Sequence, residues 1–387
     1  MFVYRDTLEH GSTGCPIRSW LPQEEIEDGA NEQIVNASRL PFVKTICVMP
    51  DCHSGYGVPV GSVVVSQGAI SPASVGVDIG CGMAAMAVFI DPDKVVAEAD
   101  ILRHSIERSI PTGFHQHNNP LVEDVGAPIC VGKANVDIGK ITRQCGTLGG
   151  GNHFIEVCLD ENRNVWVMIH SGSRNTGLKV ANYYINIAKN MMDRYFIKLA
   201  DPYLAYLPED MPEFADYWSD LTWAQNYAAI NRNMILDLIR KDIRYFVQDQ
   251  DLVFGEPINC HHNYAVRKDD YIIVRKGAIS AKAGEIGIIP GSMGAKSYIV
   301  EGLGNMESYM SSSHGAGRLM GRKKAKEQFT IEDLDKSMAG ISYNKTVNII
   351  DEIPMAYKSI DKVMEYQKDL VKPVHTLKQI LSIKGAD

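Results

Sequence analysis

Short hydrophobic runs recur along the chain, each rich in branched residues and bounded by glycine or proline. This pattern is typical of β-strands, because branched side chains pack well on a pleated surface and glycine and proline interrupt regular structure. The sequence therefore predicts strands within six stretches: residues 42–50, 61–70, 83–90, 165–173, 271–279 and 286–292.

Longer stretches between these runs place hydrophobic residues three and four positions apart, which is the spacing of one helix face. Leu178–Leu199 carries such a stripe at Val180, Tyr184, Ile187, Met191 and Tyr195. Leu221–Phe246 carries another at Trp223, Tyr227, Ile230, Met234 and Leu238. We also expect helices in Asp91–Ile110 and Ile360–Ile380.

The predicted strands are not separated by regularly spaced helices, which disfavours a simple doubly wound parallel sheet. We predict an α+β fold of mixed β-sheets with surrounding helices. The sequence has no linker-like tract, charge block or repeat that would divide it. We therefore expect a single domain over residues 1–387.

Composition places the chain among ordinary globular proteins, with 45% hydrophobic and 22% charged residues. The net charge of −8 argues against a general nucleic-acid coat, which would be basic. A local basic concentration occurs at Gly317–Lys326, for which a solvated helix face is the simple alternative. The N-terminus lacks a basic start followed by an apolar core, and no apolar run reaches ~18 residues, so we expect a cytoplasmic protein without a leader or membrane span. The eight cysteines form no C-x-x-C pair, which favours reduced thiols.

Glycines cluster with chemically capable residues in seven loops, among them "VDIGCGM", "TLGGGNHFIEV", "INCHHNYA" and "SSSHGAGRLMGR". Glycine lets the backbone approach a ligand closely, and loops commonly carry function. Six histidines fall in these loops: His53, His153, His170, His261, His262 and His314.

Three of these histidines, together with one thiol and one acid, form a candidate metal site. His153, His170 and His262 supply imidazoles, Cys81 supplies a thiolate that can bridge two ions, and Asp78 lies three residues before it. Such a mixed set of nitrogen, sulfur and oxygen ligands suits zinc and also admits manganese, so the ligand types alone do not identify the metal. Each histidine by itself would more commonly be a core or surface residue, and the spacing is nonlocal.

His314 is a candidate nucleophile. Neutral imidazole attacks phosphorus near neutral pH, and a helix starting here would place Arg318 and Arg322 on the same face to hold phosphate oxygens. A simple phosphate contact or a position beside a helix cap is the alternative role. "PGSMGAKSY" and Arg174 add further candidate anion contacts.

Taken in order, the loops resemble the RtcB family of RNA-splicing ligases over nearly the whole chain. The resemblance rests on "VGVDIGCGM", "GTLGGGNHFIEV", "IHSGSR", "INCHHNYA", "HGAGR" and "DEIPMAYKSID". It implies a central metal and nucleotide cleft and a GTP- and manganese-dependent enzyme of RNA repair or tRNA splicing. Such enzymes join RNA 3′-phosphate or 2′,3′-cyclic phosphate ends to 5′-hydroxyl ends through a histidine-guanylate. It also implies two manganese ions, with zinc as a substitute in the isolated protein.

The resemblance assigns roles to individual residues. His314 is implied as the guanylylated nucleophile, with Asp51 as a supporting acid. Cys81 is implied to bridge two metals, with Asp78 and His262 at one site and His153 and His170 at the other. The implied nucleotide pocket comprises Asn152, Phe154, Glu156, Ser292, Ser297, Tyr357 and Lys384. The implied RNA- or phosphate-facing arginines are Arg174, Arg318 and Arg322.

Two departures from the family pattern concern RNA binding: residues 110–137 are short and not especially basic, and the continuation after Arg174 is poorer in glycine. Two other functions compete with the ligase. One is a dinuclear metal-dependent phosphodiesterase or hydrolase. The other is a non-catalytic RNA-binding protein with a structural zinc. We expect a monomer.

Overall fold

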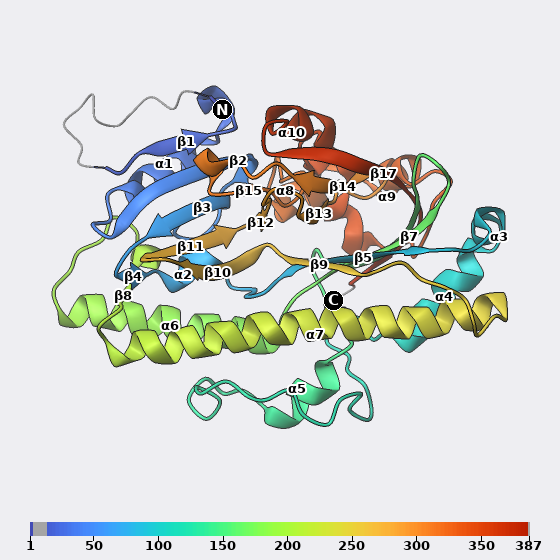
Figure 1. Cartoon of the computed structure of the whole chain (residues 1–387), viewed down its shortest axis with the longest axis horizontal. Coiled ribbons are helices and arrows are strands. Elements are labelled where there is room, and N and C mark those ends of the chain that lie inside the picture. The colour runs from blue at the N-terminus through green and yellow to red at the C-terminus, as the bar shows by residue number, and fades with distance from the viewer. Residues whose placement is uncertain (3–13, 386–387) are drawn as a thin grey trace.

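Two mixed sheets and a layer of long helices make up the computed structural model, which describes residues 1–2 and 14–385 (Figure 1). Residues 3–13, on which the expectation of no leader rests in part, lie outside the described residues. The α+β class is confirmed. The six predicted strand regions all contain strands, and most neighbouring strands run antiparallel, with β1–β2 and β16–β17 parallel.

The larger sheet has eight strands. Its main path is ordered β13 (Ile286–Ile289), β14 (Ser297–Gly302), β17 (Val371–Lys384), β6 (Phe154–Leu159), β7 (Val165–Ser171), β5 (Gly82–Val88) and β9 (Ile258–His261). A short eighth strand, β16 (Ser342–Tyr343), pairs with β17. Three strands from the N-terminal half, β6, β7 and β5, therefore lie between strands from the C-terminal half in one sheet.

The second sheet has five strands in the order β1 (Ile17–Ser19), β2 (Val43–His53), β3 (Val60–Ser66), β11 (Tyr271–Lys276) and β10 (Asn263–Lys268). Two small pairs complete the strands: β12 (Ala278–Ser280) with β15 (Ser311–Ser313), and β4 (Ala69–Ile70) with β8 (Leu207–Pro208).

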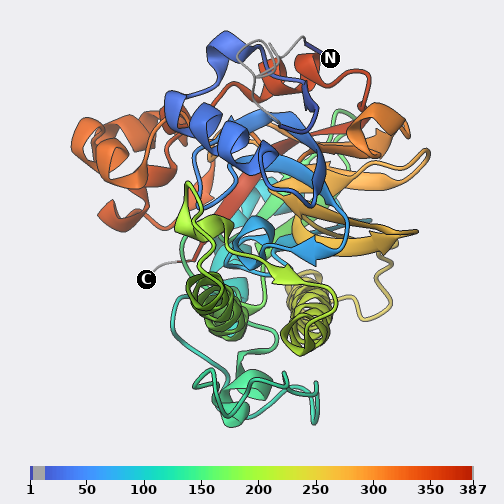
Figure 2. The same cartoon turned by 90° about the vertical axis from the view of Figure 1, so that its left-hand side faces the viewer.

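Two long helices, α6 (Arg174–Arg194) and α7 (Pro212–Val247), lie side by side beneath the sheets (Figures 1 and 2). The shorter helices are α1 (Asp28–Ser38), α2 (Pro72–Val75), α3 (Pro92–Ala97), α4 (Ala99–Ser109), α5 (Ile138–Gln144), α8 (Arg322–Gln328), α9 (Ile331–Ser337) and α10 (Ile360–Tyr366). None of the helices in the described ranges combines the length and apolar character needed to cross a bilayer. No disulfide joins any of the eight cysteines, all of which are described.

Helix α7 buries a second face besides the predicted one, of which Tyr227 is fully buried. Its fully buried positions include Leu221, Ala224, Ile235 and Ile239, which pack under the sheets, whereas Ile230 of the predicted stripe is exposed. Trp223 and Met234 of that stripe pack against the α5 segment instead. The helix is confirmed, and its buried face is corrected because α7 is covered on two sides.

Two further helix predictions need correction. Asp91–Ile110 divides into α3 and α4 around Glu98, whose backbone leaves the helical region. Ile360–Ile380 is helical only as far as Tyr366, and β17 follows. Pro373 is incompatible with the predicted continuation to Ile380, since proline in a helix interior removes a hydrogen bond and clashes with the preceding turn.

Candidate metal centre and nucleotide cavity

One edge of the eight-stranded sheet gathers four of the predicted metal ligands. His153 precedes β6, His170 lies near the end of β7, Cys81 precedes β5, and His262 follows β9. These strands are neighbours in the order β6-β7-β5-β9 and run antiparallel. Starts and ends of alternate strands therefore meet at one edge, and four loops far apart in sequence converge there.

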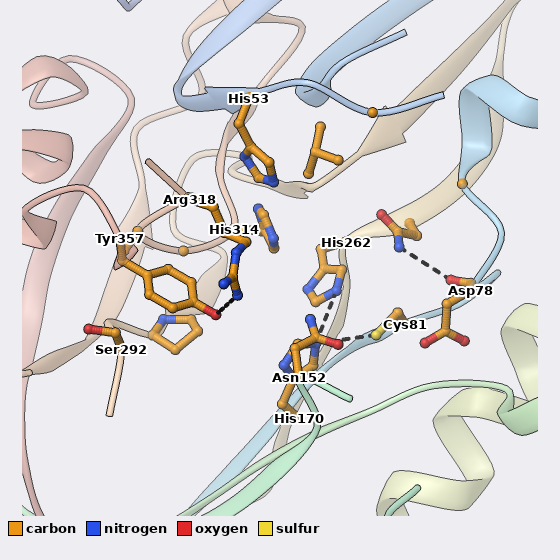
Figure 3. A pocket seen from close by; sticks show the side chains of 18 of the residues that line it. His53, Asp78, Cys81, Asn152, His170, His262, Ser292, His314, Arg318 and Tyr357 are labelled. Carbon is orange, nitrogen blue, oxygen red and sulfur yellow. Dashed lines mark hydrogen bonds between the residues drawn. The ribbon is translucent and has the colours of Figure 1, made fainter. Parts of the chain in front are cut away.

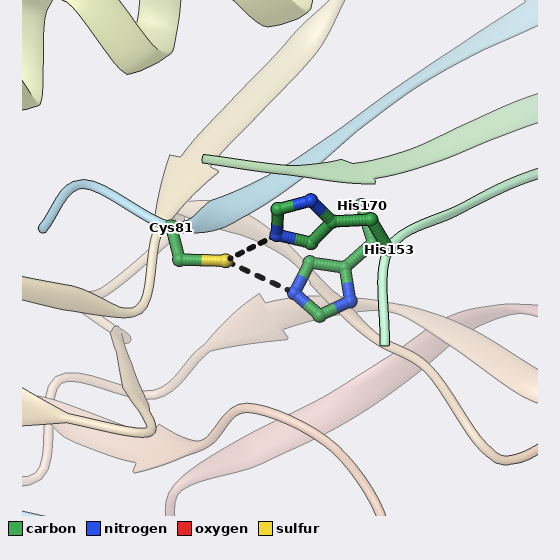
Figure 4. Close-up of side chains that lie close together, drawn as sticks. All are labelled: Cys81, His153 and His170. Carbon is green, nitrogen blue, oxygen red and sulfur yellow. Dashed lines mark hydrogen bonds between the residues drawn. The ribbon is translucent and has the colours of Figure 1, made fainter. Parts of the chain in front are cut away.

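The ligand atoms are in mutual contact. The Cys81 Sγ lies 3.2 Å from His170 Nε2 and 3.5 Å from His153 Nε2 (Figure 4). His170 Nε2 lies 3.3 Å from His262 Nε2, and His153 Nε2 lies 3.1 Å from the Asp78 Oδ2. All five predicted ligands thus form one continuous cluster.

The contacts show which of these ligands are neighbours. The ligand atoms of Cys81, His153 and His170 all lie within 4.8 Å of one another, so His153 and His170 lie together as the resemblance implies. Asp78 lies beside His153, and His262 lies beside His170. The Asp78 carboxylate packs over Gly172, where a β-carbon would overlap it. Gly172 follows β7, so the acid lies on the β6–β7 side of Cys81, and β9 lies on the other side.

The protonation states of the cluster suit metal ions. Burial, and then His153, lower the pKa of His170 well below its ordinary value. Burial, and then His314, do the same to His262. Both rings therefore stay neutral with lone pairs available. Burial and the Asp78 carboxylate raise the pKa of the Cys81 thiol well above its ordinary value, so a thiolate here requires a compensating cation.

His314 stands next to this cluster, with its ring centroid 4.6 Å from that of His262. Its Nδ1 lies 2.7 Å from the Asp51 Oδ2, and its backbone N–H donates to the same oxygen at 3.1 Å. Asp51 is fully buried at the end of β2. A carboxylate accepts, so the ring proton resides on Nδ1 and Nε2 keeps its lone pair.

The expected helix from His314 through Arg322 is absent from this segment. Gly317 has φ +72°, and a β-carbon there would overlap the Asp51 carbonyl, so the chain turns sharply and α8 begins only at Arg322. Arg318 still reaches the site, since it lines the same cavity as His314. Its position comes from the turn and not from helical periodicity.

A cavity of about 480 Å³ opens in front of His314 and the cluster (Figure 3). Most of the predicted site residues line it: Asp78, Cys81, Asn152, Phe154, Glu156, His170, His262, Ser292, His314, Arg318, Arg322, Tyr357 and Lys384. These residues come from all parts of the sequence, so the predicted constellation does converge.

One wall of the cavity is organised by Glu352, a residue that sequence reasoning did not single out. It accepts from Lys384 Nζ at 2.9 Å, from Tyr357 Oη at 2.8 Å and from Arg318 at 3.2 Å. Burial alone would raise the pKa of Glu352, but Lys384 and Arg318 outweigh it and hold the pKa at about 2. Its place in "DEIPMAYKSID" was the available signal.

A second acid in the cavity behaves oppositely. Glu156 on β6 is paired in register with Ser382 on β17, and burial raises its pKa to about 8 despite Lys384 nearby. Its Oε2 has no hydrogen-bond partner within the described residues. The Lys384 ammonium also lies 5.4 Å from the ring centroid of Phe154. A buried acceptor without a partner suits a ligand that brings donors.

Besides the buried Asp51, three predicted residues do not line this cavity. The Ser297 Oγ accepts from the Gly291 N–H at 3.1 Å and supports the turn before Ser292 without lining the cavity. Arg174 and His153 line a second cavity of about 650 Å³. Asp78 lines both cavities, so the cluster lies between them. Arg174 donates to Thr147 and to the Gly113 carbonyl there.

Taken together, fold and site define a candidate metal centre joined to a pocket that His314 lines. The chain matches the family model described as tRNA-splicing ligase RtcB over residues 33–131 and 131–385. It is 42% identical over 402 residues to the RNA-splicing ligase RtcB of Escherichia coli (strain K12), covering 96% of this chain and 98% of that protein. The chain therefore belongs to the RtcB family.

More distant relatives agree over similar lengths. The tRNA-splicing ligase RtcB of Nanoarchaeum equitans is 29% identical, with 97% of each chain covered. The RNA-splicing ligase RtcB of Mycobacterium tuberculosis (strain H37Rv) is also 29% identical, with 91% of this chain and 100% of that protein covered. The similarity thus extends across both cavities and the cluster between them.

Proposed function

We propose that this protein is a GTP- and manganese-dependent RNA ligase. It joins an RNA 3′-phosphate or 2′,3′-cyclic phosphate end to a 5′-hydroxyl end, in RNA repair or tRNA splicing. The observation that carries the proposal is His314, oriented by Asp51, beside a cluster of five candidate ligands, four of which line the same cavity as His314. Membership of the RtcB family supports the same function.

In the first step, His314 Nε2 attacks the α-phosphorus of GTP, forms an N–P bond and displaces pyrophosphate. Asp51 keeps the proton on Nδ1 and stabilises the positive charge that the ring acquires. Glu156 accepts the guanine N–H edge with Lys384 nearby, while Arg318 faces the anionic part of the nucleotide.

The cluster fits two divalent cations, since it offers neutral imidazoles, a thiol and a carboxylate in mutual contact. Asp78, Cys81, His153, His170 and His262 would hold these ions. When bound, such ions neutralise phosphate charge and polarise phosphorus.

The later steps transfer the guanylate to RNA. A cyclic phosphate is first hydrolysed to a 3′-phosphate, whose oxygen then attacks the guanylate phosphorus and releases His314. The 5′-hydroxyl attacks the activated 3′-phosphate, and GMP leaves. Arg174 and Arg322 border the second and first cavities and are suited to hold RNA phosphates.

A ligation assay with two short RNAs tests this proposal. One RNA carries a 2′,3′-cyclic phosphate and the other a 5′-hydroxyl, and products are resolved by length. We expect joined product only when GTP and Mn²⁺ are both present. Opening of the cyclic phosphate without joining would favour the hydrolase, and binding without any product would favour the RNA-binding protein; either contradicts the proposal.

A further inference from the structure

Two consecutive polar residues in the middle of α7, Asn231 and Arg232, are fully buried. They occupy positions where the neighbouring buried residues, such as Ile235 and Ile239, are aliphatic. Burying a guanidinium costs roughly several kcal/mol of folding free energy unless each of its N–H groups finds an acceptor. The hydrogen-bond partners of Asn231 and Arg232 therefore indicate why polar residues occupy these buried positions.

Arg232 binds three backbone segments that carry metal ligands. Its Nη1 donates to the Gly80 carbonyl at 2.8 Å and to the Ser171 carbonyl at 2.9 Å. Its Nη2 lies 3.0 Å from the side-chain Nδ1 of His261, which accepts from the guanidinium when the ring proton is on Nε2. The same Nδ1 lies 3.0 Å from the Gly80 carbonyl, so His261 is held between the two groups. Each of these acceptors is the immediate neighbour of a ligand, namely Cys81, His170 and His262. The Nε donates to Asn259 Oδ1 at 2.7 Å.

Asn231 is linked to the fourth ligand, His153, through Ser171 and the Leu148 carbonyl. Its Oδ1 accepts from the Gly146 and Thr147 N–H groups at 2.8 and 3.1 Å, and its Nδ2 donates to Ser171 Oγ at 3.0 Å. That hydroxyl donates to the Leu148 carbonyl, which also lies 3.0 Å from His153 Nδ1. A proton held on Nδ1 leaves His153 Nε2 free to face the cluster.

We infer that Asn231 and Arg232 are positioning residues that set the spacing of Cys81, His153, His170 and His262. The inference rests on the metal centre proposed above. The fork of a single arginine spans the ends of β5, β7 and β9 at once, and its rigid plane fixes their separation. Lysine carries the same charge but lacks this geometry.

Cobalt titration of the metal-free protein tests the inference without GTP or RNA. Absorption from the thiolate–cobalt bond reports Cys81 ligation, and the d–d bands report coordination geometry. We expect R232Q and R232K each to bind Co²⁺ at least ~10-fold more weakly than wild type, with altered bands, as loss of an outer partner typically causes. Arg103→Gln is the matched control. It removes another buried arginine, on α4, which contributes nothing to the cluster, so its cobalt binding should be unchanged.

Wild-type affinity and spectrum in R232Q and R232K would overturn the inference. Recovery of wild-type binding in R232K alone would assign the effect to charge and would also overturn positioning by the fork. If R232Q does not fold, the cobalt titration of R232K alone tests the inference. Failure of the wild-type protein itself to bind Co²⁺ would instead count against the proposed metal centre.

Discussion

Glu156 is a carboxyl group buried in the cavity wall, and burial raises its pKa to about 8. At neutral pH it is therefore mostly protonated when the cavity holds no ligand. In the proposed function, guanine presents two adjacent N–H donors, and only an ionised carboxylate offers an acceptor oxygen to each of them. Binding of the base in this way would release the proton of Glu156, so that base recognition would depend on pH.

This linkage predicts that guanosine binds the metal-free protein more tightly as pH rises. Below the pKa each pH unit changes the ionised fraction ~10-fold, so affinity should rise ~10-fold from pH 6 to 7 and level off above pH 8. Isothermal titration at several pH values measures this. Guanosine is the chosen ligand because it lacks a titrating phosphate.

Glu156→Gln is the matched control, because an amide of the same shape does not titrate. Its guanosine affinity should be weak and independent of pH. A wild-type affinity that does not vary between pH 6 and 8 would contradict the assignment of Glu156 to the guanine edge.

At the same scale, residue type indicated which side chains would come together, whereas spacing along the chain did not indicate which of them would be in contact. The glycine-rich loops contain Cys81, Asp78 and the three histidines, and these residue types are common metal ligands. The pairing of Asp78 with His153 depends on which strand lies on which side of β5. That order is a property of the sheet, and spacing along the chain does not contain it.

At the scale of elements, the metal centre is the edge of a sheet. Four antiparallel strand ends bring the ligands together, and the loop before β5 folds back so that Asp78 lies over Gly172. A side chain at position 172 would occupy the space of that carboxylate. The absence of a side chain there thus sets the place of one ligand.

Gly172→Ala should therefore displace Asp78 and weaken Mn²⁺ binding by at least ~10-fold, comparable to loss of a supporting partner. Electron paramagnetic resonance of free Mn²⁺ during titration gives the affinity. Gly321→Ala is the control, because position 321 has open space and an ordinary φ of −65°. Equal Mn²⁺ affinity in G172A and G321A would show that Asp78 is not held in this way.

The prediction of helices was right where hydrophobic periodicity along the chain determines the structure, and wrong where contacts with distant residues determine it. Hydrophobic periodicity identified α6 and α7, but α7 is covered on two sides, so periodicity selected the face toward α5. The arginine spacing after His314 suggested a helix, whereas Gly317 requires a turn against Asp51. The conformation at Gly317 depends on its contact with Asp51 in β2, a strand far away in the sequence, and the local sequence does not reveal that contact.

At the scale of the whole molecule, the fold places the candidate centre between two cavities. The sheet order interleaves strands from residues 82–171 with strands from residues 258–384, so the site exists only when both halves pair. Family resemblance anticipated this convergence, while charge and composition did not. Although the net charge of the chain is −8, three cationic residues, Arg318, Arg322 and Lys384, line the first cavity.

The central claim is that His314 forms a covalent guanylate beside the metal cluster. The most direct measurement incubates purified protein with GTP labelled at the α-phosphorus and Mn²⁺, then denatures it and maps the label by peptide mass spectrometry. We predict one acid-labile, base-stable label on His314, absent from His314→Ala protein that still binds metal. A label that persists in His314→Ala, or no label on metal-loaded wild type, would contradict the account.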